Sequence, residues 1–321
     1  MKRGILGIAL LFSLIAAVSC ERRDMYNENT GVYLRLKIDT LITNYTVRQL
    51  PETMRVMIYE EETERLKGYN FVGPEGGEIN VAPGDYDMLV YNFGTETTAL
   101  RSDGSWNTIE AYTNPVSRFV LANVAVCFSK NKSDKPTRPT RPEGESVVYS
   151  PDHLFVARRE GLQIPVRVEN EVMIVEAEAK SVVESWTLSV RTVKGMQYVR
   201  SVSALITGMS GGNRIALNER STSPVTIYFD MEKEAENGRL TARFETFGKL
   251  ADQASVVSVV VTDTSGGQYQ YDFDLTEQFE NNPAQHLSVE TEIDVPEPSQ
   301  GGGGFRPTVD EWEDINQDIE L

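Results

Sequence analysis

One short stretch of the sequence has the letters of a serine nucleophile. Residues 208–212 (GMSGG) match the G-x-S-x-G pattern around Ser210, and Asp263 and His286 follow in the chain order of a hydrolase triad. That chemistry requires a strand-to-helix turn, with a helix amide behind the serine. Residues 213–229 have instead the pattern of a loop followed by a strand. We therefore interpret the motif as a hairpin turn and expect that the protein is not an enzyme.

Few side chains remain for metal or redox chemistry. The soft ligands of the whole chain are Cys20, Cys127, His153 and His286, which are too few for a Cys₄ or Cys₂His₂ zinc site. Acidic residues crowd the C-terminal tail, but an EF-hand loop starting at Asp310 would place Ile315 and Leu321 where calcium binding needs Gly and Glu. We expect no metal and no cofactor, and we interpret both histidines as structural.

One tryptophan is a candidate for contact with a sugar. Trp106 lies in the polar stretch 102–107, and an exposed indole ring can stack on a sugar or a protein partner. The alternative that we favour is that Trp106 folds back onto the edge of the protein body. A glycan-binding role therefore stays a second hypothesis.

The charge balance disfavours one class of partner. The 321 residues include 31 Lys and Arg against 48 Asp and Glu, a formal net charge of −17, and the pI is near 4.7. Proteins that bind nucleic acids gain affinity from clustered Lys and Arg, which release counterions from phosphates. We expect no nucleic-acid partner.

The N-terminus has the pattern of an export signal. Lys2 and Arg3 precede an apolar run over residues 5–18, which is too short for the roughly 20 apolar residues that a membrane-spanning helix needs. Residues 17–20 (AVSC) resemble a bacterial lipobox, in which cleavage between Ser19 and Cys20 leaves a lipidated cysteine. The alternative is an ordinary secretory signal with an incidental cysteine.

A lipid on Cys20 would have to hold the protein at the membrane by itself. Removal of residues 1–19 takes away Lys2 and Arg3 and lowers the formal net charge to −19, so the body gains nothing from an anionic lipid surface. Three acyl chains would nevertheless make release negligible. Cys127 would then have no intramolecular partner, and we interpret it as a buried thiol.

The body of the chain has the alternating pattern of strands. Apolar and polar residues alternate through Val32–Ile38, and the same period recurs near residues 186–190, 225–229, 240–244, 269–275 and 287–295. Residues 256–261 form a continuous apolar run, typical of a strand covered on both sides. Helix signals are short: Asp230 is a candidate cap for residues 231–237, and Thr276 for a turn that ends before Pro283. The pattern predicts an all-β protein with little helix.

The length favours two β-sandwich domains. One sandwich takes about 100 residues, and 302 residues follow the signal. We expect a signal peptide at 1–19, a lipidated linker at 20–30, an N-terminal sandwich at 31–157 and a C-terminal sandwich at 158–321. Within these, residues 130–142 form a basic, proline-rich loop, residues 301–304 form a glycine-rich joint and residues 305–321 form an acidic tail.

Several motifs together resemble the fimbrillin-type surface lipoproteins of Bacteroidota, in particular their pilus anchor and accessory subunits. They are residues 82–92 (APGDYDMLVYN), 152–155 (DHLF), 204–209 (ALITGM), 244–248 (FETFG) and the ending from Gly304 to Leu321, which looks like the tail of a subfamily with no assigned function. The resemblance covers most of the mature chain.

The resemblance implies two tandem transthyretin-like sandwiches, attachment to the outer membrane through Cys20 and a role in a pilus. In polymerising members of the family a protease cuts after an arginine, the first strand leaves, and a segment of a neighbouring subunit fills the groove. Here Val32–Ile38 would be that first strand and Arg48 the candidate cleavage site. An uncut anchor keeps the strand, which is the alternative that we prefer. Whether residues 305–321 pair within their own domain or are donated to another subunit stays open, as does a host or glycan ligand.

Overall fold

The computed structural model describes residues 29–43, 45–46, 50–117, 120, 145–168 and 171–298. Strands dominate these ranges, as the alternation predicted. Helix contributes little to them, in the 3₁₀ turns η1 (Met196–Tyr198), η2 (Ala235–Asn237) and η3 (Thr276–Phe279). The turn expected after Thr276 is η3, but Thr276 is its first residue and not its cap, because the N-cap position is held by Leu275 without a side-chain hydrogen bond. The helix expected at 231–237 is wrong, because β18 continues to Glu234 and only the last turn is helical.

The first sheet has seven strands. Their order is β5 (Leu66–Val72), β4 (Met54–Glu60), β7 (Gly84–Asn92), β11 (Phe155–Ile164), β12 (Met173–Ser181), β1 (Thr30–Ile38) and β6 (Gly76–Val81). β11 pairs with β12 only through Phe155 and Val156, so the sheet bends there. Its two outermost strands, β5 and β6, are consecutive in the chain and contact each other. The curled sheet therefore encloses its own apolar core, which includes Val32, Leu34, Val56 and Val90.

The second sheet has eight strands. Along its path lie β21 (Gln268–Asp274), β20 (Val256–Asp263), β15 (Val199–Ser210), β18 (Pro224–Glu234), β19 (Arg239–Thr246), β13 (Glu184–Val190) and β22 (His286–Val289), and β10 (Ser146–Tyr149) pairs with β18 from outside the path. The apolar run that became β20 is covered on both sides. Val257, Val259 and Val261 belong to the large core of this sheet, and Val260 belongs to a smaller cluster behind it.

Three small sheets complete the described strands. They are β2 (Leu41–Ile42) with β3 (Tyr45–Thr46), β14 (Val193–Lys194) with β23 (Ile293–Asp294), and an antiparallel sheet in the order β17 (Glu219–Arg220), β16 (Gly212–Arg214), β9 (Glu110–Thr113) and β8 (Thr98–Arg101). This four-stranded sheet joins segments about 100 positions apart in the sequence, since Asn213 pairs with Ala111.

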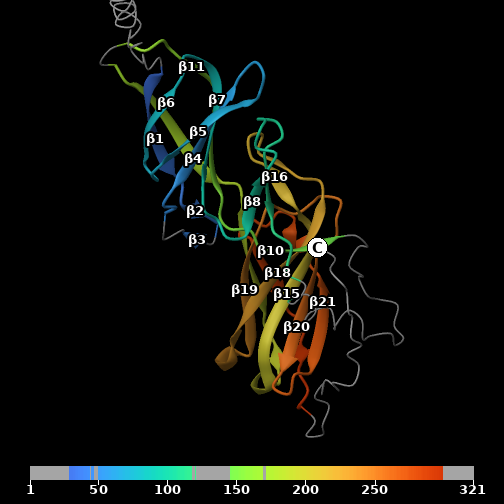
Figure 1. Cartoon of the computed structure of the whole chain (residues 1–321). Helices are drawn as coiled ribbons and strands as arrows, with labels where there is room; N and C mark the ends of the chain where they lie inside the picture. The colour runs from blue at the N-terminus through green and yellow to red at the C-terminus, as the bar shows by residue number, and fades with distance from the viewer. Residues whose placement is uncertain are drawn as a thin grey trace, which may run out of the picture.

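A third apolar cluster, which we call the junction cluster, joins the two large sheets. It contains Met57, Tyr59, Leu89, Tyr91, Trp106, Ile109, Ala111, Leu154, Val156, Val183, Ile215, Ala216 and Phe247. Figure 1 shows the first sheet above, the second sheet below, and β8 and β16 between them. Asn92, at the end of β7, donates a hydrogen bond to the carbonyl oxygen of His153 (3.1 Å) and accepts one from the amide of Phe155 (2.7 Å). The two large sheets thus follow each other along a long molecule, and the junction lies at the carboxyl end of β7.

The boundary expected at residue 157 falls inside β11. Both β11 and β12 lie mostly beyond it, and yet they pair with β7 and β1 of the first sheet. The first sheet therefore takes strands from both sides of that position. The division into two sandwich domains stays a prediction, although the two large apolar cores are separate.

Candidate strand-exchange site and pocket

The first strand of the chain lies inside its sheet. β1 pairs in parallel with β12, from Val32 opposite Met173 to Ile38 opposite Ala179. On its other edge it pairs antiparallel with β6, from Thr30 opposite Val81 to Arg35 opposite Gly76. The N-terminal element is thus flanked by strands on both edges, and its removal would expose the edges of both neighbours.

One face of β1 supplies core to the first sheet. Val32 and Leu34 are 0% exposed and Leu36 is 8% exposed, and all three belong to the core of that sheet. Because side chains alternate along a strand, the residues between them point outward. A segment that replaced β1 would need apolar side chains at every second position to refill this groove.

The outer face of β1 carries two ion pairs to β12. Arg35 lies 3.2 Å from a carboxylate oxygen of Glu176, and Lys37 lies 2.8 Å from one of Glu178. The hydrogen bond with Glu178, followed by its charge, raises the pKa of Lys37, and the same hydrogen bond lowers the pKa of Glu178. The two pairs are exposed to solvent, so they select the register of β1 against β12 more than they stabilise the fold.

A glycine lets β6 approach β1 closely. Gly76 has a φ of 98°, and a β-carbon on it would lie 2.8 Å from the carbonyl carbon of Leu34 and closer still to its oxygen. Any larger residue would have to push β1 away or change the turn before β6. The glycines of the stretch 73–77 (GPEGG) are the sequence signal for this close approach, which we did not predict.

Both ends of β1 are tied to neighbouring segments. The Thr30 hydroxyl donates a 2.6 Å hydrogen bond to the Pro165 carbonyl oxygen, and the Asp39 amide donates a 2.9 Å bond to that of Ala179. The cleavage site expected at Arg48 lies outside the described residues, as do Ser19 and Cys20. Lipidation and proteolytic processing therefore stay predictions.

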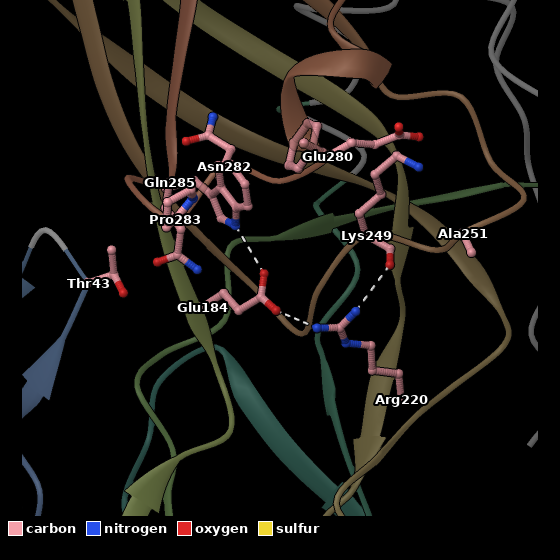
Figure 2. Close-up of a pocket in the computed structure, with 11 residues that line it drawn as sticks. Thr43, Glu184, Arg220, Lys249, Ala251, Glu280, Asn282, Pro283 and Gln285 are labelled. Carbon is pink, nitrogen blue, oxygen red and sulfur yellow. Dashed lines mark hydrogen bonds and ion pairs between the residues drawn. The ribbon is translucent and has the colours of Figure 1, made fainter.

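A pocket of about 620 Å³ lies beside the second sheet, where the segment after β1 reaches it. Figure 2 shows dashed lines from the Glu184 carboxylate to Arg220 and from Arg220 to Lys249. The Trp186 indole N–H donates to Glu184 (3.1 Å), and Arg220 forms an ion pair with the other carboxylate oxygen. The pocket is lined by Thr43, Glu184, Trp186, Arg220, Lys249, Ala251, Phe279, Glu280, Asn282, Pro283 and Gln285.

The polar groups of this pocket bond mainly to one another. Arg220 also donates to the Lys249 carbonyl oxygen (3.4 Å), and the Lys249 ammonium donates to the Leu250 carbonyl oxygen (3.1 Å). Trp186 packs on Phe279 with ring centroids 4.4 Å apart. We interpret these contacts as structural: they hold β13, the 248–251 loop and η3 together.

The three residues of the hydrolase motif serve separate turns and strands. Ser210 is 1% exposed and donates 2.8 Å hydrogen bonds to the carbonyl oxygens of Gly212 and Ser221. Asp263 accepts from the amides of Ser265 and Gly267, and hydrogen bonds to these groups, against the opposing effect of desolvation, lower the pKa of Asp263. His286 contacts the hydroxyls of Thr187 and Ser189. The motif links β15 to β16, which lie in different sheets and do not pair with each other, so the predicted hairpin turn is wrong.

Trp106 is buried. It is 5% exposed and packs edge-on against Tyr59, with ring centroids 5.6 Å apart, in the junction cluster. The preference for an indole folded back onto the body is confirmed. A sugar therefore has no access to the one aromatic residue on which the glycan hypothesis rested.

His153 is a structural residue at the junction. Its ring lies 3.8 Å from a carboxylate oxygen of Glu245. Burial lowers the pKa of His153, with a further contribution from Arg243, and burial also raises the pKa of Glu245. Both shifts favour the neutral forms, so we do not treat this contact as an ion pair at neutral pH.

Two further features bear on function. Within the described ranges, no three His, Cys, Asp or Glu side chains are grouped so that they could hold a metal ion. A helix long and apolar enough to cross a membrane is likewise not found among the residues that the structure describes.

The chain is similar to a family of proteins to which no function has been assigned. A family model described as a domain of unknown function, DUF5119, matches residues 19–230. The chain belongs to the DUF5119 family. The matched region runs from the end of the expected signal peptide through the whole first sheet and into β18.

This DUF5119 protein is 30% identical over 247 residues to a candidate fimbrium anchoring subunit of Bacteroides ovatus, Fim4B. The match covers 76% of this chain and 65% of Fim4B, so it spans slightly less than two thirds of that relative. A crystal structure of a candidate adhesin from Bacteroides ovatus is similar with a TM-score of 0.60 and 25% identity, over 88% of this chain and 99% of that one. The resemblance to fimbrillin-type proteins is confirmed.

Proposed function

We propose that this DUF5119 protein is a non-enzymatic fimbrial subunit, held in the outer membrane by a lipid on Cys20, which anchors a pilus or acts as its accessory adhesive subunit. The identity to a candidate fimbrium anchoring subunit supports the pilus role. The lipobox at 17–20 supports the anchor. The position of β1 supports an anchor rather than a processed stalk subunit.

β1 is suited to transmit a pull from the membrane. β1 begins at Thr30, ten positions after Cys20; it is paired along both edges and contributes Val32 and Leu34 to the core. A force along β1 shears the two ladders, so many hydrogen bonds must break together. An anchor that kept β1 would use this resistance, whereas cleavage after Arg48 would separate β1 and its lipid from the body.

An edge of the second sheet offers a place for a partner subunit. β21 (Gln268–Asp274) is the last strand of its path and pairs on one side with β20. Its seven residues are all half-buried or exposed. Unpaired N–H and C=O groups along such an edge accept an added strand from another chain. We propose that strand addition at β21 joins this subunit to the next one while β1 stays in place.

Intact mass and N-terminal analysis of protein purified from native cells test this proposal. We expect a chain that begins at triacylated Cys20 and continues through Arg48. An Arg48→Ala variant should have the same mass as the wild type apart from the substitution. A chain that starts at Gln49 would overturn the anchor in favour of a processed subunit, and a secreted chain with an unmodified Cys20 would overturn lipid anchoring.

Pilus assembly gives a second test. Proline removes an amide donor from a strand edge, so Gln270→Pro in β21 should reduce recovery of pilus subunits with the protein. Replacement of Lys67 in β5 by proline is a matched control on an edge strand of the other sheet. Unchanged recovery for the β21 variant, with a normal thermal unfolding midpoint, would remove β21 from the proposal.

An exposed aromatic group favours the second candidate function, a surface glycan-binding lipoprotein. Tyr69, Phe71 and Phe93 are 54%, 49% and 53% exposed. Phe71 lies edge-on to both neighbours, with centroids 5.7 Å from Tyr69 and 5.2 Å from Phe93. The Arg55 guanidinium lies 4.4 Å over the Tyr69 ring and donates to the Tyr91 hydroxyl. Rings with a polar group beside them can stack on sugars.

A binding assay on immobilised bacterial and host polysaccharides tests this second function. If it is correct, Tyr69→Ala with Phe71→Ala abolishes retention, and Tyr33→Ala, at another exposed tyrosine, does not. Equal behaviour of both variants, or no retention of the wild type, would remove the glycan function and leave the pilus proposal unaffected.

A further inference from the structure

One end of the first sheet lies far from the junction with the second sheet. β7 ends at the junction, and its first residue Gly84 pairs with Ile164, the last residue of β11. β12 and β1 both begin at this far end, because they run parallel and β12 returns toward the start of β11. In Figure 1 this end is at the top of the molecule. β1 therefore begins at the end of the first sheet that lies opposite the second sheet.

The far end carries an unusual set of exposed aliphatic side chains. Val166 and Val168 follow β11, Val172 precedes β12, and Ile174 is the second residue of β12. Their exposed fractions are 74%, 52%, 55% and 51%. We call these four residues the apolar tip. Four β-branched side chains, each more than half exposed and close together in the chain, are a candidate contact surface for an apolar partner.

The outer face of β1 and β12 changes character away from the tip. Tyr33 is 41% exposed and pairs with Ile174 of the tip. One step further along the same face lie the Arg35–Glu176 pair and then the Lys37–Glu178 pair. Tyr33 and Ile174 thus share one level of this face, and the two charged pairs follow within about 13 Å of strand at roughly 3.3 Å per residue. Proteins that contact a bilayer often place tyrosine at the headgroup level.

The lipid anchor would attach at the same end. Thr30 lies ten positions after Cys20, a span of about 35 Å at most when fully extended. Thr30 in turn is hydrogen-bonded to Pro165, the residue directly before Val166. A bilayer that holds the lipid of Cys20 is therefore within reach of the apolar tip.

We propose that the apolar tip inserts into the interface of the bilayer that carries the lipid anchor, so that the first sheet stands on the membrane and the second sheet points away from it. This inference rests on the proposed lipid anchoring. Arg167 and Glu171 lie within the same loop, and charged groups at this place keep the insertion shallow, at headgroup depth. The tip fixes the orientation of the body, while the acyl chains supply the affinity.

Fluorescence of the full lipidated protein in vesicles of phosphatidylethanolamine and phosphatidylglycerol tests the inference. A Cys127→Ala background with Val168→Cys carries an environment-sensitive dye at the tip, and Lys180→Cys, at the other end of β12, is the matched control. We expect a blue shift and quenching by nitroxide-labelled lipids for the dye at 168. The dye at 180 should stay accessible to iodide in the water.

A second variant separates insertion from mere proximity to the anchor. Val166→Asp with Val172→Asp keeps the lipid and changes only exposed side chains, so it should float with vesicles and unfold at the wild-type temperature. We expect the dye at 168 to lose its lipid quenching in this variant. Retained quenching would overturn the inference.

Flotation distinguishes the two ways in which the experiment can fail. Protein that does not float with the vesicles contradicts the lipid anchor itself, and the inference falls with it. Protein that floats but leaves the dye at 168 accessible to water contradicts only the tip. A blue shift without lipid quenching indicates contact with a second copy or another protein, and this also overturns the inference.

Discussion

Lys37 and Glu178 are 141 positions apart in the sequence and form a 2.8 Å hydrogen bond across the parallel strands β1 and β12. The pair fixes which residue of β12 faces each residue of β1. Arg35 and Glu176 repeat the contact two residues earlier. Exposed pairs of this kind contribute to register, because a slip by one residue would place every charge opposite an apolar position.

Charge reversal should therefore weaken β1, and a second reversal should restore it. We expect Lys37→Glu to lower the free energy of unfolding because it places two carboxylates opposite each other, and Lys37→Glu with Glu178→Lys to recover most of the loss. Urea unfolding of the four proteins in a double-mutant cycle, at low and high salt, measures this. A coupling that does not weaken with salt would contradict a solvent-exposed pair.

Gly76 should be intolerant of a side chain. An alanine would be strained at φ 98° and would collide with the backbone of Leu34, and left-handed backbone alone costs about 1–2 kcal/mol for a residue with a β-carbon. We expect Gly76→Ala to lower the free energy of unfolding by at least this amount. Gly31→Ala on β1 is the control, because a β-carbon there meets nothing within 4 Å. Equal effects of the two variants would show that the close approach is absent.

Trp106 should matter for stability and not for sugar binding. Its burial in the junction cluster predicts that Trp106→Ala loses about 3–5 kcal/mol of unfolding free energy, as large-to-small changes in cores do. Thermal and urea unfolding measure the loss. Phe93→Ala, at an exposed aromatic residue, should cost much less. A stable Trp106→Ala protein that had lost affinity for a polysaccharide would contradict this assignment.

Ser210 should also be structural. Its hydroxyl bonds to the carbonyl oxygen of Gly212 in β16 and to that of Ser221, which follows β17, so Ser210→Ala should cost about 1–3 kcal/mol, the penalty for unpaired buried polar groups. Hydrolysis of short-chain nitrophenyl esters by the purified protein should be at the level of buffer for wild type and variant alike. Turnover that Ser210→Ala abolished would establish an enzyme.

His153 should make the fold sensitive to mild acid. Burial lowers the pKa of His153 below its ordinary value of 6.5, so the unfolded chain binds a proton more readily than the native one. Above about pH 7 the His153 ring is neutral in both states and does not change the free energy of unfolding with pH. As the pH falls from 6.5 through the lowered pKa, the free energy of unfolding decreases. We expect His153→Asn to reduce this loss between pH 7 and 5, as measured by urea unfolding. Since burial raises the pKa of Glu245, Glu245→Gln serves as a comparison with the opposite trend.

Local strand structure was largely predictable from the sequence. The alternation at Val32–Ile38 and the apolar run at 256–261 both appear as strands, as predicted, because each depends on neighbours within a few residues. The predicted strand at 287–295 is split into β22 and β23. Residues 231–234 were misassigned because their helix propensity is overruled by pairing with β19.

The long-range arrangement was not predictable in the same way. Nothing near Val32 indicates that its parallel partner begins at Met173, and we predicted no strand at 173–181. A signal was present there, since Glu176, Glu178 and Lys180 alternate with small apolar residues. The exposed aromatic group at Tyr69, Phe71 and Phe93 was missed for another reason: apolar residues on an edge strand have the same pattern whether they are covered or not.

The parallel pairing of β1 with β12 also determines the order in which the strands of the first sheet can pair as the polypeptide is synthesised. The ribosome delivers Thr30 early, and β6 follows within about fifty residues, so a β1–β6 unit can form promptly. The other flank of β1 waits until Ser181 has been made, about 150 residues after Thr30. Throughout this interval one edge of β1 has unpaired backbone N–H and C=O groups. Such long-range pairing is slow, and the exposed edge can pair with a wrong strand. Cellular folding helpers that shield nascent strands would be needed most during this stage of biosynthesis.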